Sequence, residues 1–169
     1  TSSPPLNRWW DQPASGTWGP SQKVLSTSRI PAVRAMIMYP TNALVEDQMT
    51  RMRATLSRLM AFLGLENPPI SFGRYTGSTP STLPRGKAVP DTVSETGDMP
   101  QIIREWKTQK AAAIEKVATS PDTPPDLIYQ IPDPELGEML TRWDMIETPP
   151  DIFITNQSML NIMLMRETE

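Results

Sequence analysis

The sequence contains no cysteine and no histidine among its 169 residues. Disulfide bonds and thiolate metal sites are therefore excluded, and a zinc ion would have to be bound by carboxylates alone. Catalysis by a serine–histidine or cysteine–histidine pair is excluded as well. No apolar run approaches the roughly 20 residues of a membrane-spanning helix, and the N-terminus lacks the basic and apolar regions of a signal peptide. We expect a soluble, cytoplasmic protein with no membrane partner and no metal site.

Proline, by contrast, is abundant, with 19 residues, about twice its usual share. This predicts long irregular segments between the regular elements. Residues 1–32 show no sustained period and are expected to form an irregular arm. The remaining residues, 33–169, are expected to form one domain interrupted by proline-rich loop insertions at 78–98 and 119–134.

The arm carries three tryptophans, Trp9, Trp10 and Trp18. Large aromatic side chains act mostly through the area they bury, so we expect these residues to anchor the arm on an apolar surface. Stacking on nucleic-acid bases is the alternative.

Charge is divided unevenly along the chain. Residues 1–87 carry ten Lys/Arg and four Asp/Glu, a net +6, and residues 88–169 carry six and fifteen, a net −9, which together give the overall −3. A basic half fits contact with a polyanion such as nucleic acid. An uneven distribution of solvated charge explains the pattern about as well.

Hydrophobic periodicity predicts an α/β fold with a mainly parallel sheet flanked by helices. The apolar run 32–39 indicates a strand covered on both faces. An apolar stripe at helical spacing follows from about 43 to 63, with Thr41 or Asn42 as the cap and Gly64 as the stop. Three arginines lie off this stripe and are expected on a solvated face: Arg51, Arg53 and Arg58.

The middle of the chain predicts shorter elements. Residues 70–75 alternate as a short strand that ends in a Gly/Thr loop, and a helix covers roughly 99–118, with Ile114 among its inward residues. Residues 127–131 are a candidate strand. Asp133 and Pro134 have the composition of a helix start, and that helix is expected to end near Trp143.

The last unit repeats the pattern of the first one. Residues 151–154 predict a buried strand, Thr155 and Asn156 a break, and residues 158–166 a helix with Leu164 among its inward residues. Three strands therefore end in a loop that carries Thr with Asn or Gly. If the strands are parallel, right-handed crossovers place all three loops on one edge of the sheet.

These loops have the chemistry of phosphate contacts rather than of catalysis. Thr hydroxyls, Asn amides, backbone left accessible by Gly and the N–H groups at helix starts suit the phosphates of a nucleic-acid strand. None is a base, or a nucleophile with an activating partner, and each loop alone is explained as well by helix capping. The residues that offer these groups are Thr41, Asn42, Thr76, Gly77, Thr155 and Asn156.

The same segments resemble the motifs of superfamily 2 helicases of the DEAD/DEAH type. Tyr39 to Gln48 matches Tyr-Pro-x-Asn-Ala-Leu-x-x-Asp-Gln, the form of motif Ia in large members. Phe72 to Pro80 resembles the loop motif that follows, and Pro150 to Leu160 resembles the Thr-Asn-x-x-Met-Leu motif before the DEAH box. Order and strand-loop-helix context agree over residues 35–165.

Within the superfamily, the segments Phe72 to Gly77 and Arg142 to Met145 look most like DrmA-type proteins, the helicase-like components of bacterial DISARM anti-phage systems. MrfA-like repair helicases are the nearest alternative. The resemblance implies part of a first RecA-like domain in an ATP-dependent DNA helicase or translocase. It also implies that the three loops grip the backbone of one DNA strand, and the candidate DNA-backbone contacts are Pro40, Thr41, Asn42, Thr76, Gly77, Thr155 and Asn156. It implies ATP and Mg²⁺ as cofactors of the parent protein. The implied partners are DNA, as a single strand or duplex junction, the rest of the parent helicase, and a DrmB-like protein.

The chain departs from the family where the motor residues are concerned. A P-loop requires Gly-x-x-x-x-Gly-Lys-Ser/Thr, but Gly86-Lys87 is followed by Ala88 and has Ser81 where the first glycine belongs. No Asp-Glu dipeptide exists, so the metal-binding Asp and catalytic Glu of a DEAH box are absent. In the family these motifs lie before residue 1 and after residue 169. We therefore expect an interior fragment that has no catalytic residue and binds neither cofactor alone.

Three hypotheses follow. A DNA-gripping segment predicts a parallel sheet with Thr41, Thr76 and Thr155 on one edge, and DNA affinity that falls steeply with salt. A non-enzymatic interaction module would use the prolines, tryptophans and acidic second half to bind a protein. An unrelated α/β domain is the third.

Overall fold

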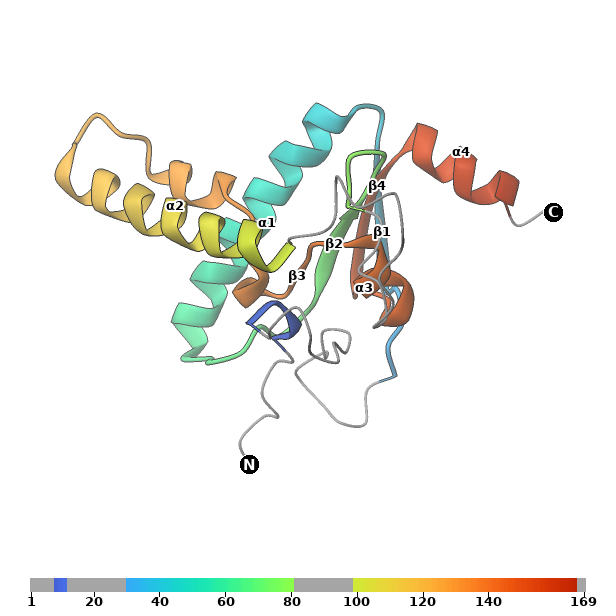
Figure 1. Cartoon of the computed structure of the whole chain (residues 1–169), viewed down its shortest axis with the longest axis horizontal. Coiled ribbons are helices and arrows are strands. Elements are labelled where there is room, and N and C mark those ends of the chain that lie inside the picture. The colour runs from blue at the N-terminus through green and yellow to red at the C-terminus, as the bar shows by residue number, and fades with distance from the viewer. Residues whose placement is uncertain (1–7, 12–29, 81–98, 167–169) are drawn as a thin grey trace.

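The computed structural model describes residues 8–11, 30–80 and 99–166 (Figure 1). Its centre is a sheet of four strands in the order β1-β4-β2-β3, and every pairing is parallel. The strands are β1 (Ala35–Tyr39), β2 (Phe72–Tyr75), β3 (Glu138–Met139) and β4 (Ile152–Asn156). The predicted α/β class, with a parallel sheet flanked by helices, is confirmed.

Four α-helices and three short 3₁₀ helices are described around this sheet. The α-helices are α1 (Asn42–Leu63), α2 (Met99–Thr119), α3 (Arg142–Glu147) and α4 (Gln157–Arg166). The 3₁₀ helices are η1 (Trp9–Asp11), η2 (Pro125–Gln130) and η3 (Pro134–Leu136). In Figure 1, α1 lies along the sheet, α2 lies outside it with η2 between them, and α4 projects away. No helix in these described ranges is long and apolar enough to span a bilayer.

The main core lies between α1 and one face of the sheet. The first part of the predicted apolar stripe of α1 packs there, and the fully buried members of the cluster are Val45, Met49, Leu56, Phe72 and Ile154. Gly64 ends the helix as predicted, with φ 62° in the left-handed region, and its N–H and that of Leu65 bond back to the last turn. Because α1 starts at the end of β1, this packing fixes where its N-terminus lies.

A second core holds the described part of the arm. Trp9 and Trp10 are buried, with exposures of 0% and 2%, among Met99, Ile103 and Trp143. Trp9 makes edge-to-face contacts with Trp10 and Trp143 at ring-centre distances of 5.6 and 5.9 Å. The anchoring predicted for these two tryptophans is confirmed. Trp18, like most of the segment 1–32 and the insertion 81–98, lies outside the described residues.

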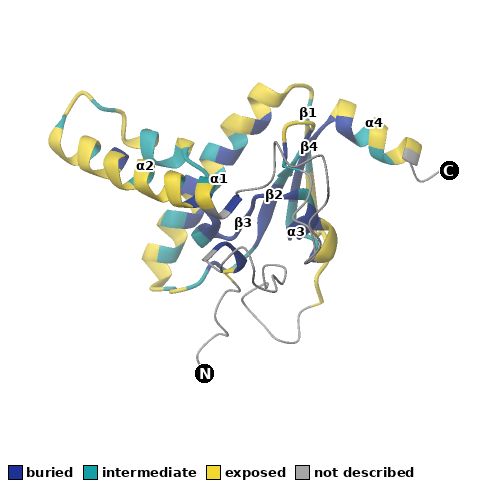
Figure 2. Cartoon of the chain, in the orientation of Figure 1, coloured by how far each residue is buried: buried dark blue, intermediate teal, exposed yellow. Residues whose placement is uncertain are grey.

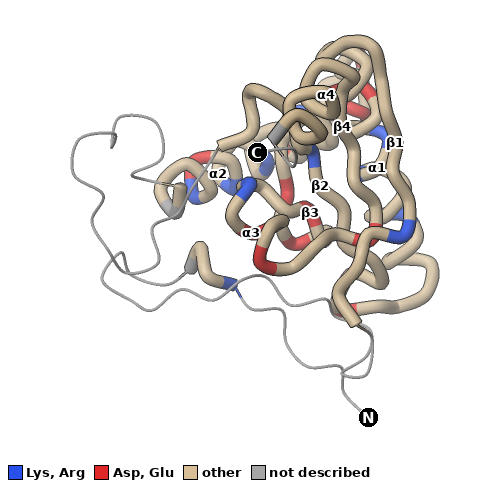
Figure 3. Tube along the Cα trace, turned by 90° about the vertical axis from the view of Figure 1, so that its right-hand side faces the viewer, with Lys and Arg blue, Asp and Glu red and all other residues tan. Residues whose placement is uncertain are grey.

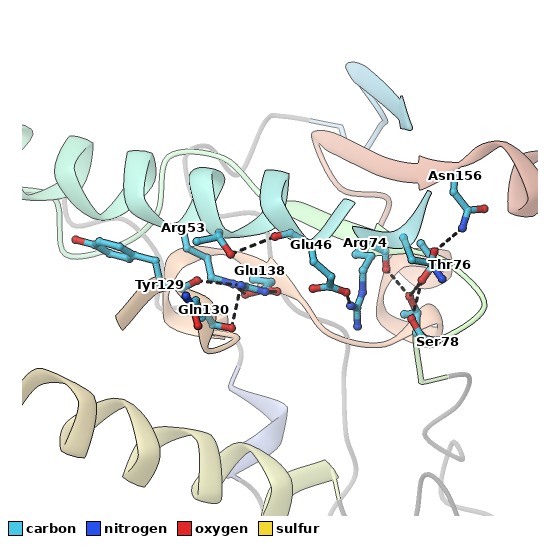
Figure 4. A network of polar contacts seen from close by, with 12 residues as sticks. Glu46, Arg53, Arg74, Thr76, Ser78, Tyr129, Gln130, Glu138 and Asn156 are labelled. Carbon is cyan, nitrogen blue, oxygen red and sulfur yellow. Dashed lines mark hydrogen bonds and ion pairs between the residues drawn. The ribbon is translucent and has the colours of Figure 1, made fainter. Parts of the chain in front are cut away.

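Arg53 is the clearest correction to the sequence-based predictions. It was expected on a solvated face, but it is 3% exposed and forms a two-pronged ion pair with buried Glu138 at 2.7 and 2.6 Å (Figure 4). Its remaining nitrogen, Nη1, donates to the backbone carbonyl oxygen of Tyr129. Arg51 and Arg58 are exposed as predicted. The prediction failed because the partner of Arg53 comes from a strand far along the chain, which a helical stripe does not show.

Other corrections concern local structure. Residues 127–131 were predicted as a strand, but most of them belong to η2, which begins with Pro125 because proline is favoured in a first helical turn. The helix predicted from Pro134 to Trp143 is only the 3₁₀ helix η3, which ends at Leu136 because Gly137, with φ 82°, caps it before β3 and α3. The predicted break at Thr155 and Asn156 is the end of β4 itself.

Exposure also differs from prediction in several places. The first strand was expected to be covered on both faces, yet β1 is at the edge of the described sheet, and Met36 and Met38 are half-exposed. Figure 2 shows how buried and exposed residues are distributed over the elements. Four apolar residues predicted to be inside are exposed as well, because the described part of the chain provides no second layer over them: Leu59, Leu63, Ile114 and Leu164.

Candidate functional site

The ends of the three predicted strands meet at the carboxyl edge of the sheet. Tyr39 of β1 lies beside Asn156 of β4, and Tyr75 of β2 lies beside Thr155, so the three strands end at nearly the same level. The segments that follow these ends are seen together at the top of Figure 1. The parallel register thus brings all seven candidate residues to one edge, as the first hypothesis required.

Four of the seven candidates are open to solvent: Pro40, Thr41, Asn42 and Gly77. Thr41 has the extended backbone of an N-cap, with φ −131° and ψ 156°, but its side chain makes no capping hydrogen bond. Its hydroxyl is therefore not committed to the helix that it precedes. The first N–H groups of α1 lie beside it and have no partner within the helix.

Two of the buried candidates use their hydroxyls inside the protein. Thr155 is 0% exposed, and its hydroxyl donates to the backbone carbonyl oxygen of Tyr75 at 2.7 Å. This hydrogen bond joins β4 to the end of β2. Thr76 is also 0% exposed, and its hydroxyl lies 3.0 Å from that of Ser78 (Figure 4). Its N–H donates to the Thr79 hydroxyl. These internal hydrogen bonds fix the positions of the strand ends at the carboxyl edge of the sheet.

Asn156 connects the starts of two helices. Its amide nitrogen donates to the Asn42 side-chain oxygen at 2.6 Å, and its amide oxygen accepts from the Met159 N–H in the first turn of α4 at 2.7 Å. The residue is 8% exposed. Its amide holds the N-termini of α1 and α4 together, a role that only the folded register shows.

Arg142 also lies at this edge, although it is not among the seven candidate residues predicted from the sequence. Its side-chain nitrogen Nη2 donates to the oxygens of Thr76 and Gly77 at 2.7 and 3.1 Å, and its backbone N–H donates to the Pro80 oxygen. Its guanidinium lies over the Tyr75 ring, 5.4 Å from the centre. The residue was noticed only within a motif, because nothing in its local sequence indicates a contact with a loop 65 positions earlier.

Arg74 lies beside this edge and pairs with Glu46 in the first turns of α1 (Figure 4). Burial lowers the pKa of the Arg74 guanidinium, and the carboxylate of Glu138 opposes that shift. The pair links β2 to α1 close to the carboxyl edge of the sheet.

The described cations of the basic half are all paired with carboxylates. All six described Lys/Arg side chains of residues 1–87 lie in ion pairs, and four of them pair with carboxylates of the second half: Arg8 with Glu135, Arg34 with Asp151, Arg53 with Glu138 and Arg58 with Asp126. The other two, Arg51 and Arg74, pair within α1 and from β2 to α1. Figure 3 shows the two signs interspersed along the trace. The described basic side chains of residues 1–87 therefore contribute to ion pairs within the chain and do not form an open basic patch.

Comparison with known proteins adds a biological context. The chain is similar to Druantia protein DruE of Escherichia coli (strain UMEA 4076-1), with 28% identity over 175 residues, 85% of this chain and 10% of DruE. DruE is an anti-phage defence protein, which supports the predicted defence context. The chain thus spans about a tenth of the length of this curated relative. No family model matches the chain, and no solved structure matches it significantly.

The described side chains and N–H groups at this edge are suited to binding a ligand rather than to catalysing a reaction. Besides the Arg142 guanidinium and the ion-paired Arg74, the edge offers an uncommitted hydroxyl, helix-start N–H groups and an exposed glycine. Among the described residues, no group of three or more acidic side chains is placed to bind a metal. These donors suit a ligand that is rich in hydrogen-bond acceptors, such as a chain of phosphates.

Proposed function

We propose that this chain is the DNA-backbone-gripping segment of an ATP-dependent DNA helicase or translocase that acts in anti-phage defence. The observation that carries the proposal is the level alignment of three strand ends, with Thr41, Asn42 and Gly77 exposed on one edge. The similarity to DruE supports the defence context. ATP and Mg²⁺ would be bound by other parts of the parent protein. Membership of a DISARM system with a DrmB-like partner stays a prediction from the motifs.

The geometry divides the seven candidates into two roles within this proposal. The exposed residues Pro40, Thr41, Asn42 and Gly77 contact the DNA strand. The buried residues, Thr76, Thr155 and Asn156, hold the three loops at the same level through their internal hydrogen bonds. Contacts made by neutral donors position a nucleic-acid backbone without reading its sequence.

The test uses the natural full-length protein and the substitution Thr41→Ala. Because one hydrogen bond to a charged phosphate is lost, affinity for a fluorescent single-stranded oligonucleotide should fall about tenfold. DNA-stimulated ATP hydrolysis at limiting DNA and protection of cells from phage should fall with it. Thr119→Ala is the matched control, since Thr119 is an exposed threonine at the far end of α2. Unchanged DNA affinity of both Thr41→Ala and Gly77→Ala would refute the proposal.

A further inference from the structure

Arg142 controls the direction of two peptide groups in the loop after β2. Its guanidinium accepts no bond itself but donates to two consecutive carbonyl oxygens, those of Thr76 and Gly77. In a planar trans peptide the N–H points opposite to the C=O, and the described residues contain no cis peptide bond. The N–H groups of Gly77 and Ser78 therefore point away from Arg142.

These two N–H groups are available to a ligand. Gly77 and Ser78 are both exposed, and in the described part of the chain neither N–H donates a hydrogen bond. Neighbouring N–H groups that point in similar directions form a small concavity that favours an anion. The backbone N–H of Thr76, by contrast, is used by the Thr79 hydroxyl.

The glycine itself is not explained by the packing of the loop. A methyl group at Gly77 would meet no described atom within 4 Å, and its φ is not in the left-handed region, where only Gly64 and Gly137 are found among the described glycines. Glycine here leaves the backbone accessible from outside. This agrees with the close approach of a ligand to the two N–H groups.

Arg142 is itself held firmly, as a positioning residue must be. It follows Thr141, the fully buried N-cap of α3, whose side chain accepts from the Asp144 N–H. The Asp144 carboxylate accepts from the indole N–H of buried Trp9 at 3.2 Å. The start of α3 is therefore fixed from two sides, and the loop is fixed to it.

We propose that Arg142 is a positioning residue that turns the N–H groups of Gly77 and Ser78 outward to bind one phosphate of the DNA backbone. This inference rests on the proposed function and deepens it by assigning a phosphate subsite and the residue that sets its geometry. Arg142 acts through the loop and does not contact DNA. A direct contact by its guanidinium would be a different mechanism with a different salt dependence.

The experiment compares Arg142→Gln and Arg142→Lys in the full-length protein, with Arg58→Gln as a control that removes an exposed arginine of α1. Affinity for a fluorescent single-stranded oligonucleotide is measured over a series of salt concentrations, and hydrogen exchange of residues 74–80 is followed by mass spectrometry without DNA. We expect Arg142→Gln to weaken DNA binding about tenfold, through the loss of phosphate contacts, and to raise exchange in the loop. Arg142→Lys should recover part of both, and Arg58→Gln should change neither.

The slope of log affinity against log salt separates positioning from direct contact. Because the phosphate is bound by neutral N–H groups, the slope of Arg142→Gln should equal that of the unaltered protein. A slope reduced by about 0.7 to 0.9 means that the guanidinium neutralised a phosphate itself, and this overturns the inference. Unchanged loop exchange, or unchanged affinity, overturns it too. If the unaltered protein binds no DNA, the proposed function fails together with the subsite; if it binds and Arg142→Gln binds equally well, only the inference fails.

Discussion

At the scale of single residues, two glycines of the described chain have opposite reasons to be glycine. A Cβ at either position would meet no described atom within 4 Å, but Gly64 has φ 62°, a backbone conformation that costs other residues free energy, whereas Gly77 is outside that region. One glycine serves the fold and the other serves the proposed site.

Alanine substitutions at these glycines should separate stability from binding. Gly64→Ala should lower the free energy of unfolding by about 1 to 2 kcal/mol, because alanine is strained in the left-handed region, and should leave DNA affinity unchanged. Gly77→Ala should leave stability unchanged and weaken DNA binding several-fold, because its methyl group would stand where the phosphate approaches. Urea unfolding and oligonucleotide titration measure the two effects. Equal effects of both substitutions on binding would contradict the assignment.

The buried ion pair of Arg53 and Glu138 is the second residue-scale feature. Both side chains are 4% exposed, and Glu138 also accepts from the Asp133 N–H at 2.8 Å. Truncating one partner leaves an uncompensated buried charge, so Arg53→Met should cost about 3 to 5 kcal/mol of unfolding free energy. Removing Arg51, whose pair with Asp47 is exposed, should cost less than about 1 kcal/mol.

A double substitution tests whether the loss comes from the stranded charge. Arg53→Met with Glu138→Met removes both charges, and it should cost less than Arg53→Met alone, because replacing a whole buried pair by apolar residues is often neutral. Urea unfolding of Arg53→Met, Glu138→Met and the double variant supplies the comparison. An additive loss would point to the hydrogen bonds of Arg53 with the backbone of η2 as the main contribution.

At the scale of elements, the sequence predicted what depends on neighbouring residues. The first part of the apolar stripe of α1, its end at Gly64 and the strand-to-helix units β1-α1 and β4-α4 are local patterns, and the structure contains them. What depends on distant residues was not predictable in the same way. The stripe of α1 marks Arg53 as solvated, and only the arrival of β3 beside it, 85 positions later, makes it a buried ion-pair partner.

The candidate site follows the same division. Its location could be predicted, because parallel strands bring their carboxyl ends to one edge whatever the details of packing. The roles of its residues could not. That Thr155 and Asn156 face inward, and that Arg142 holds the loop after β2, depends on the register of β4 with its two neighbours and on the place of α3.

The contact of η1 with α3 gives an element-scale prediction. Trp9→Ala removes a fully buried aromatic side chain and the donor to Asp144, and should cost about 3 to 5 kcal/mol of unfolding free energy. Trp9→Phe keeps most of the ring contacts and loses the hydrogen bond, so it should cost about 1 to 3 kcal/mol. Urea unfolding followed by circular dichroism distinguishes them. If Trp9→Ala were as stable as the unaltered chain, the packing of Trp9 would contribute nothing to the stability of the fold.

At the scale of the whole molecule, the two halves of the sequence depend on each other for charge. The four ion pairs that join residues 1–87 to residues 88–169 account for part of the +6 and −9 of the halves, and they bring early and late segments together. Affinity for DNA at the described edge would therefore come from neutral donors. Steep salt dependence of the parent protein, if it is measured, would have to arise from cations elsewhere.

The outer side of β1 also determines how copies of the chain behave toward one another. In the described sheet no strand pairs with this side, and the strand Ala35–Tyr39 contains neither a charge nor a proline that would discourage pairing. Met36 and Met38 present half-exposed apolar surface beside the unpaired backbone. A chain separated from the rest of a longer protein would tend to aggregate by edge-to-edge strand pairing as its concentration rises. A lysine in place of Met36 would oppose that association without touching the carboxyl edge where DNA is proposed to bind.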